Sequence, residues 1–290
     1  MKRLLITGAN SYIGTSFEDY MNRNFPEALQ IDTLDMLDEH WKETDFSGYD
    51  AIFHVAGIAH ADVSNVSKET EQLYYRVNTD LAITTAKKAK EDGAGQFIFM
   101  SSMIIYGGKE HITAQTQPSP ANFYGDSKWQ ADKGVRELED THFRVAVLRP
   151  PMIYGKGSKG NYPVLAKLAT KLPVFPKVSN RRSMLYIENL CEFLRIVIEK
   201  ELSGVFFPQN DELVNTSTLV RMIAKAKNKR THVTCVLTPF AALGKHIPGK
   251  IGNLCRKAFG SSYYDMDMSE IGYPYRVAGL EESIQRTEGR

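Results

Sequence analysis

The first fourteen residues constrain the fold more than any other part of the chain. Residues 2–7 form a short apolar run, Gly8 and Gly14 follow, and a helical pattern continues to about Arg23. A strand, a glycine turn and a helix in this order open a dinucleotide-binding unit, because glycine lets the backbone approach a pyrophosphate at the positive end of the helix. Ser11 replaces the middle glycine, and its small hydroxyl suits a phosphate. We therefore expect dinucleotide contacts from Gly8, Asn10, Ser11, Tyr12, Ile13 and Gly14.

Further apolar runs alternate with helical segments along the first half of the chain. The runs cover residues 28–31, 50–55, 96–100 and 144–149, and a helical pattern covers 69–91. This alternation predicts an α/β fold with a doubly wound parallel sheet, a Rossmann fold, covered on both faces. We place the dinucleotide-binding domain at 1–155 with a returning segment near 183–200. A smaller, discontinuous C-terminal substrate-binding lobe takes most of 156–290.

Residues at the ends of these runs are candidates for cofactor contacts. Asp32 closes the second run about twenty residues after the glycine turn, where an acid suits hydrogen bonds to an adenosine ribose and repels the 2′-phosphate of NADP. NAD is favoured over NADP by this acid alone, and Asp32 and Asp35 are equally well read as ordinary loop acids. Small residues after the third run leave room for a cofactor. The candidates in these two places are Asp32, Asp35, Met36, Val55, Ala56 and Gly57.

Tyr124 and Lys128 carry the predicted chemistry. Four residues apart, they lie on one face of a helix. An ammonium at ~4 Å would lower the phenol pKa from about 10 by up to nearly three units. Such a phenol exchanges protons with a sugar hydroxyl or carbonyl at neutral pH. The same spacing also occurs by chance on solvated helix faces. Ser102, after the run 96–100, is placed to hydrogen-bond a substrate oxygen.

The order of short motifs resembles a known family over nearly the whole chain. TGANSYIG, HVAG, SSMIIYG, YGDSK and LRPPMIYG resemble the extended short-chain dehydrogenase/reductase family, in its NAD-dependent epimerase/dehydratase branch that acts on nucleotide sugars. The resemblance implies a catalytic triad of Ser102, Tyr124 and Lys128, with Tyr124 as the acid/base and Lys128 on the nicotinamide ribose. It implies further cofactor contacts from Asn78, Pro150 and Ile153, and a homodimer.

The lobe is expected to hold the sugar nucleotide. Asn161 opens an apolar helical stretch, where it would cap the helix or contact a diphosphate. The resemblance assigns the diphosphate to Arg182, whose guanidinium fork suits phosphate oxygens. Two adjacent arginines are also typical of a solvated surface. The expected substrate contacts are Ser102, Met103, Asn161 and Arg182.

Three functions remain open. Met103 and Ile104 follow Ser102 where the dehydratases of the family carry an Asp-Glu pair, and apolar side chains transfer no protons, so dehydration is disfavoured. The leading prediction is an NAD(P)-dependent reductase of a 4-keto nucleotide-diphosphate sugar, in polysaccharide biosynthesis. Its rival is a 4-epimerase that uses the same residues and keeps its NAD. The third is a non-enzymatic dinucleotide-binding protein, because fold does not fix function.

Composition excludes several other classes. The 290 residues carry a formal net charge of +2, which gives no bulk electrostatic case for nucleic acid. No apolar run reaches the ~20 residues that span a bilayer, and no signal-peptide pattern opens the chain, so we expect a cytoplasmic protein. Cys191, Cys235 and Cys255 lack the CxxC spacing of a metal site, so no metal is expected.

One basic region has two interpretations. Lysines and arginines between 245 and 257 are interleaved with Ile247, Ile251 and Leu254. We favour the solvated side of a lobe helix over contact with a membrane. The alternative is an amphipathic face that docks on an anionic membrane or another protein.

Overall fold

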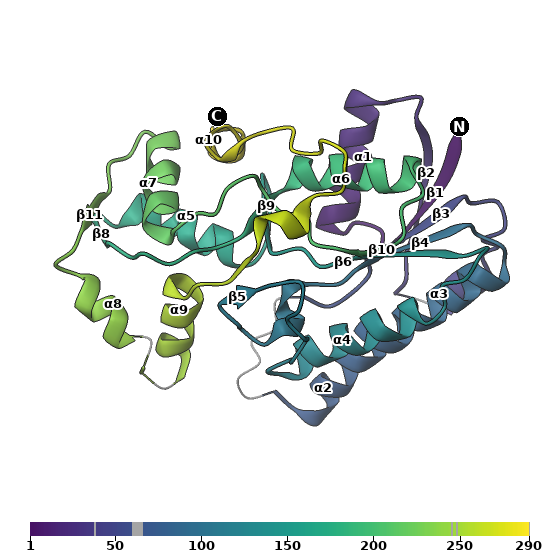
Figure 1. Ribbon diagram of the computed structural model, residues 1–290, viewed down its shortest axis with the longest axis horizontal. Coiled ribbons are helices and arrows are strands. Elements are labelled where there is room, and N and C mark those ends of the chain that lie inside the picture. Colours follow the sequence, from purple (N-terminus) through teal and green to yellow (C-terminus); the bar gives the residue numbers. More distant parts are fainter. Residues whose placement is uncertain (38, 60–65, 245, 248, 290) are drawn as a thin grey trace.

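A six-stranded parallel sheet forms the body of the computed structural model, which describes residues 1–37, 39–59, 66–244, 246–247 and 249–289 (Figure 1). Its strands run in the order β10 (Gly204–Phe206), β6 (Arg144–Leu148), β4 (Gln96–Met100), β3 (Ala51–His54), β1 (Lys2–Thr7) and β2 (Leu29–Leu34). All neighbouring pairs are parallel. The predicted α/β, doubly wound sheet is confirmed. The order reverses between β1 and β3, where such sheets bind their ligands at the carboxyl ends of the strands.

Both faces of the sheet are covered by helices. Leu4 and Ile6 pack on the side of α1 (Tyr12–Asn24) and α6 (Ile187–Glu199), whereas Leu5 points to the opposite side. That side is covered by α3 (Leu81–Glu91) and α4 (Phe123–Arg136), whose small residues form one apolar cluster with the strands. Figure 1 shows α1 and α6 above the sheet, and α3, α4 and α2 (Lys68–Tyr75) below it. Burial on both faces explains the nearly continuous apolar character of these strands.

Two predicted boundaries differ from the structure. The second strand continues beyond Asp32, because β2 pairs with β1 residue by residue as far as Thr7 and Leu34. The returning segment also reaches further than residue 200, since β10 adds the edge strand beside β6. The helical pattern predicted for 69–91 is one run, in which a π-helical turn η2 (Arg76–Asp80) separates α2 from α3.

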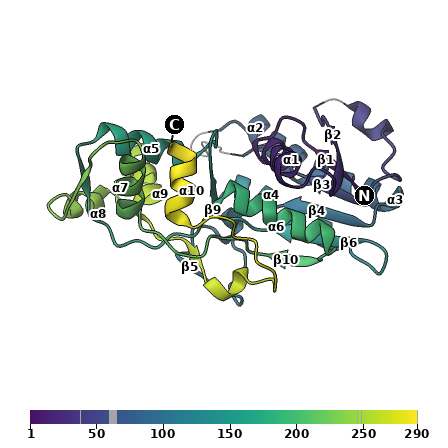
Figure 2. The same ribbon diagram turned by 90° about the horizontal axis from the view of Figure 1, so that it is seen from above.

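The lobe lies at the end of the molecule away from the sheet (Figures 1 and 2). It contains α5 (Asn161–Lys171), β8 (Val174–Pro176), α7 (Thr216–Ala226), β11 (His232–Thr234), α8 (Thr238–Gly244) and α9 (Gly249–Phe259). Strand β11 pairs in parallel with β8. The N-cap of α5 is Gly160 and no side chain caps this helix, so the prediction that Asn161 caps it is wrong.

Short strand pairs and a terminal helix tie the lobe to the sheet. Strand β7 (Met152–Tyr154) pairs with β9 (Met184–Tyr186), and β5 (His111–Ile112) pairs with β12 (Tyr263–Tyr264). The remaining elements are η1 (Glu39–Glu43), η3 (Met103–Tyr106), η4 (Met266–Ser269) and α10 (Leu280–Glu288). Within the described ranges, no helix has the length and apolar character that crossing a bilayer requires.

Candidate active site

The glycine turn after β1 is built for close backbone contact. Gly8 has φ +112°, and a Cβ there would lie 2.7 Å from the backbone nitrogen of Ala56. Ser11 is the N-cap of α1, where its Oγ accepts a hydrogen bond from the amide of Gly14 at 3.2 Å. The serine in the middle position therefore organises the start of the helix. Asn10, with φ +62°, completes a turn that presents the positive end of α1.

The segment after β3 lies against this turn. The amides of Val55 and Ala56 donate to the carbonyl of Thr7 at 3.0 and 2.9 Å. At Gly57, a Cβ would lie 3.0 Å from Asn78 Oδ1 and 3.1 Å from Lys128 Nζ. The structure therefore brings together three of the predicted site residues, Gly57, Asn78 and Lys128, and a side chain at Gly57 would press on the other two.

Asn78 joins this segment to α4. It is fully buried in the π-helical turn η2. Its Oδ1 accepts from the amide of Ile58 at 2.8 Å, and its Nδ2 donates to the carbonyl of Ile58 at 3.1 Å and to Ser127 Oγ at 3.2 Å. All polar atoms of the amide are thus satisfied. Single π turns inside helices frequently mark functional sites.

Lys128 and Tyr124 differ from the expectation in their electrostatics. Lys128 is 7% exposed, its Nζ donates to the carbonyl of Met100 at 3.1 Å, and burial lowers its pKa to about 8. Burial raises the pKa of Tyr124 to about 12, and Tyr74, whose ring centroid lies 5.9 Å away, adds to the rise. The prediction that the pKa of Tyr124 is lowered is therefore wrong for this structure, because desolvation dominates.

Ser102 and Met103 lie where β4 and β6 end. Ser102 caps η3, and its Oγ accepts from the amide of Ile104 at 3.2 Å. The amide of Met103 donates to the carbonyl of Pro150 at 3.0 Å, and Met103 Sδ accepts from Ser262 Oγ of the lobe at 3.2 Å. The ends of both strands thus meet the lobe at Met103.

A buried ion pair behind these residues was missed by sequence reasoning. Asp132 on α4 binds Arg149 through both carboxylate oxygens, at 2.9 Å to Nε and 2.7 Å to Nη2. Ser101 Oγ donates to the same carboxylate at 2.8 Å, and Arg136 Nε donates to it at 3.0 Å. The pair therefore holds α4 against the residues preceding Ser102 and Pro150. Its signal was an acid four residues after Lys128, on the face of α4 that also carries Ala131 and Val135.

The predicted cofactor residues on β2 and α1 take separate roles. Asp32 accepts from Arg3 at 3.2 Å and from the hydroxyl of Tyr49 at 3.0 Å. Asp35 is the first residue after β2, and its exposed carboxylate accepts only from the amide of Leu37 among the described contacts. Four other predicted cofactor residues are partly buried. Met36 packs on the apolar cluster between the sheet and α3 and α4, whereas Tyr12, Ile13 and Ile153 pack on the cluster on the side of α1 and α6.

Asn161 and Arg182, the two predicted substrate residues of the lobe, lie on elements that do not carry Ser102, Tyr124 or Lys128. Asn161 is exposed at the start of α5. Arg182 exchanges backbone hydrogen bonds with Val214, its Nη1 donates to the carbonyl of Gly260 at 3.4 Å, and burial lowers its pKa. Arg181 beside it stacks on Tyr263, with the guanidinium 4.3 Å from the ring centroid.

Comparison with known proteins gives consistent relatives. The family model described as "NAD dependent epimerase/dehydratase family" matches residues 4–206. The N-acetyl-alpha-D-glucosaminyl-diphospho-ditrans,octacis-undecaprenol 4-epimerase of Escherichia coli O157:H7 is 27% identical, over 90% of this chain and 82% of its own. The UDP-glucose 4-epimerase of Vibrio cholerae is 28% identical, over 79% and 77%.

Among solved structures, the dTDP-4-dehydrorhamnose reductase of Bacillus anthracis in complex with NADP superposes with a TM-score of 0.67. It is 22% identical and covers 80% of this chain and 83% of its own. At that identity the likeness shows a shared fold.

Proposed function

The chain belongs to the NAD dependent epimerase/dehydratase family, and we propose that within this family of enzymes it reduces a 4-keto group on a nucleotide-diphosphate sugar. The observation that carries this proposal is the setting of Tyr124 on α4, where its ring packs edge-on against Tyr74 at 5.9 Å and the buried Lys128 follows one helical turn later. Burial, with Tyr74, raises the pKa of Tyr124 to about 12, so the phenol holds its proton at neutral pH. A reductase needs a proton donor at the start of its reaction, whereas an oxidation needs a base.

In the proposed mechanism Tyr124 donates its proton to O4 of the sugar as the carbonyl becomes an alcohol. An alkoxide is more basic than a phenolate, so this transfer is downhill even from a phenol whose pKa is about 12. Ser102 donates a hydrogen bond to the same oxygen. Lys128, held by the carbonyl of Met100, places positive charge one helical turn from the phenolate that Tyr124 becomes. The nicotinamide dinucleotide supplies the hydride.

The residues of the glycine turn fit a dinucleotide. Gly8 has no space for a side chain, α1 presents its amino end, and Gly57 keeps the backbone bare between Asn78 and Lys128. We propose NAD as the cofactor, because the exposed carboxylate of Asp35 directly follows β2, where an acid repels a 2′-phosphate. A homodimer and a cytoplasmic location remain predictions.

A 4-epimerase is the second candidate, favoured by the names of the two relatives. One acts on a sugar linked to undecaprenol through a diphosphate, and the other acts on a UDP-sugar. A diphosphate is common to both, which supports the predicted role of Arg182 in this chain. An epimerase would require Tyr124 to begin as a phenolate.

The two candidates are separated by a turnover assay. Purified protein would be incubated with 4-keto and 4-hydroxy sugars on UDP, GDP, dTDP and undecaprenyl diphosphate, and the nicotinamide absorbance would be followed. The proposal predicts one NADH consumed for each 4-keto sugar reduced. Protein that carries tightly bound NAD and converts a 4-hydroxy sugar without net change of cofactor would assign the epimerase instead. The absence of turnover on the whole panel would contradict both.

A further inference from the structure

The charges of this chain are separated to an unusual degree. The segments 155–187 and 213–264 contain seven and nine lysines and arginines, and neither contains a single Asp or Glu. All 34 acidic residues therefore lie elsewhere, with the other 20 of the 36 basic ones. The formal charge is +16 on these two segments and −14 on the rest, which together give the net +2. A nearly neutral chain thus carries a strongly positive lobe.

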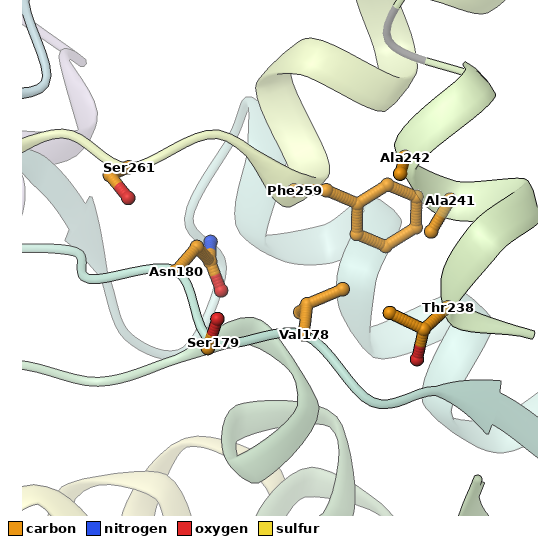
Figure 3. A pocket seen from close by; sticks show the side chains of 8 residues that line it. All are labelled: Val178, Ser179, Asn180, Thr238, Ala241, Ala242, Phe259 and Ser261. Carbon is orange, nitrogen blue, oxygen red and sulfur yellow. The ribbon is translucent and has the colours of Figure 1, made fainter. Parts of the chain in front are cut away.

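The same lobe exposes large apolar side chains in a regular order. Val236, Phe240, Leu243 and Ile247 are 72%, 68%, 65% and 44% exposed. Phe240 and Leu243, three residues apart, lie on one side of α8, and Val236 and Ile247 stand just before and just after this helix. The other side of α8 is used internally. A hollow of about 190 Å³ lies on this side, and Figure 3 shows Thr238, Ala241 and Ala242 lining it with Phe259 and Val178.

Exposed cations stand on the elements next to α8. Lys171 and Lys177 flank β8, and Lys229 and Arg230 lead into β11, the strand that pairs with β8 just before α8. Within the described part of the chain these four exposed residues have no carboxylate partner. At the end of α7, by contrast, two lysines pair with acids of α10: Lys225 with Glu281 at 2.8 Å, and Lys227, which directly follows the helix, with Glu288 at 2.9 Å.

These exposed residues come from neighbouring elements at one end of the lobe, here named the lobe tip: Lys171, Lys177, Lys229, Arg230, Val236, Phe240, Leu243 and Ile247. It lies at the end of the molecule remote from the six-stranded sheet in both views (Figures 1 and 2). We propose that the lobe tip docks on the surface of an anionic lipid bilayer, with the apolar side chains entering the headgroup region and the four cations facing lipid phosphates.

Charge complementarity decides between this occupant and others. Apolar side chains on one face with basic residues around them are the pattern of interfacial segments that bind anionic membranes. A second copy of the lobe tip would face its own positive charge across the interface, which disfavours a symmetric dimer here. Of the residues in the basic region 245–257, Lys245 and the side chains of Lys250, Ile251, Leu254 and Lys257 lie outside the described structure, and the lysines among them enter only the charge counted from the sequence.

The test is sedimentation with lipid vesicles. The full-length protein would be mixed with vesicles of equal parts phosphatidylglycerol and phosphatidylcholine, or of phosphatidylcholine alone. We expect binding to the anionic vesicles only, and weaker binding as salt is raised. The variant F240S/L243S should bind the anionic vesicles at least about tenfold more weakly than the wild type. The variant K171E/K177E/K229E/R230E should lose binding to them.

Matched variants separate the surface from bulk charge and hydrophobicity. K42E/K87E/K109E/K200E changes the net charge equally, at exposed lysines outside the lobe, and L37S removes an exposed leucine elsewhere; both should bind as the wild type. Circular dichroism would show that each variant is folded. The proposal is overturned if the wild type does not bind anionic vesicles. It is also overturned if the control charge variant loses as much binding as K171E/K177E/K229E/R230E. A concentration-dependent dimer that F240S/L243S abolishes, without vesicle binding, would assign the surface to a second copy.

Discussion

Removing the charge of Asp132 is predicted to destabilise the protein strongly. Asp132 is 0% exposed, and the Arg149 guanidinium that it binds is 6% exposed. Asparagine keeps the shape of the side chain but leaves this guanidinium without a counter-charge. Removing one partner of a buried pair costs about 3–5 kcal/mol. Urea unfolding of Asp132→Asn at constant pH should show a loss of free energy of unfolding in that range.

Two further variants test the reasoning behind that magnitude. Glu282 forms an exposed pair with Arg286 at 2.6 Å, and Glu282→Gln should cost only about 0–1 kcal/mol. The double variant D132L/R149M removes both buried charges together, and should recover most of the loss, because the remaining partner of Asp132, Arg136, has a side chain that is 35% exposed and stays hydrated. A cost of Asp132→Asn no greater than that of the exposed control, or a double variant less stable than Asp132→Asn, would refute the assigned role of the buried pair.

Two other predictions concern the groups around Lys128. Gly57→Ala places a methyl 3.0 Å from Asn78 Oδ1 and 3.1 Å from Lys128 Nζ, so it should weaken dinucleotide affinity measured by fluorescence titration, and unchanged affinity would contradict the packing. Burial lowers the pKa of Lys128 from 10.5 to about 8, so between these values the unfolded chain binds more protons and the contribution of this residue to stability rises with pH. The free energy of unfolding of the wild type, relative to Lys128→Met, should increase by about 2–3 kcal/mol across that window, and a constant difference would contradict the burial of the charge.

The sequence predicted the sheet well because its strands are buried on both faces. Runs such as 96–100 are apolar throughout, and their order along the chain implied parallel strands with helical crossovers. The glycine turn was equally readable, since Gly8 has φ +112° and a Cβ there would lie 2.7 Å from the backbone nitrogen of Ala56. The family inferred from short motifs is confirmed by the match over residues 4–206.

Properties that depend on tertiary surroundings were not readable from spacing. The distance of four residues between Tyr124 and Lys128 says nothing about desolvation, which raises the pKa of one and lowers that of the other. Asp32 was predicted to end a strand because it is an acid after an apolar run. In the structure it lies within β2, and its carboxylate accepts hydrogen bonds from Arg3 and Tyr49. The partnership of Asp132 with Arg149, 17 residues apart, needed the packed fold to appear.

The proton of Tyr124 is the centre of the proposed chemistry, and Tyr124→Phe tests it most directly. Phenylalanine keeps the ring against Tyr74 and removes only the hydroxyl. Single-turnover reduction of the 4-keto sugar that the wild type accepts should slow by about 10²–10⁴-fold, while NADH affinity stays unchanged. Reduction by the variant at the rate of the wild type, with NADH bound equally well, would contradict the account.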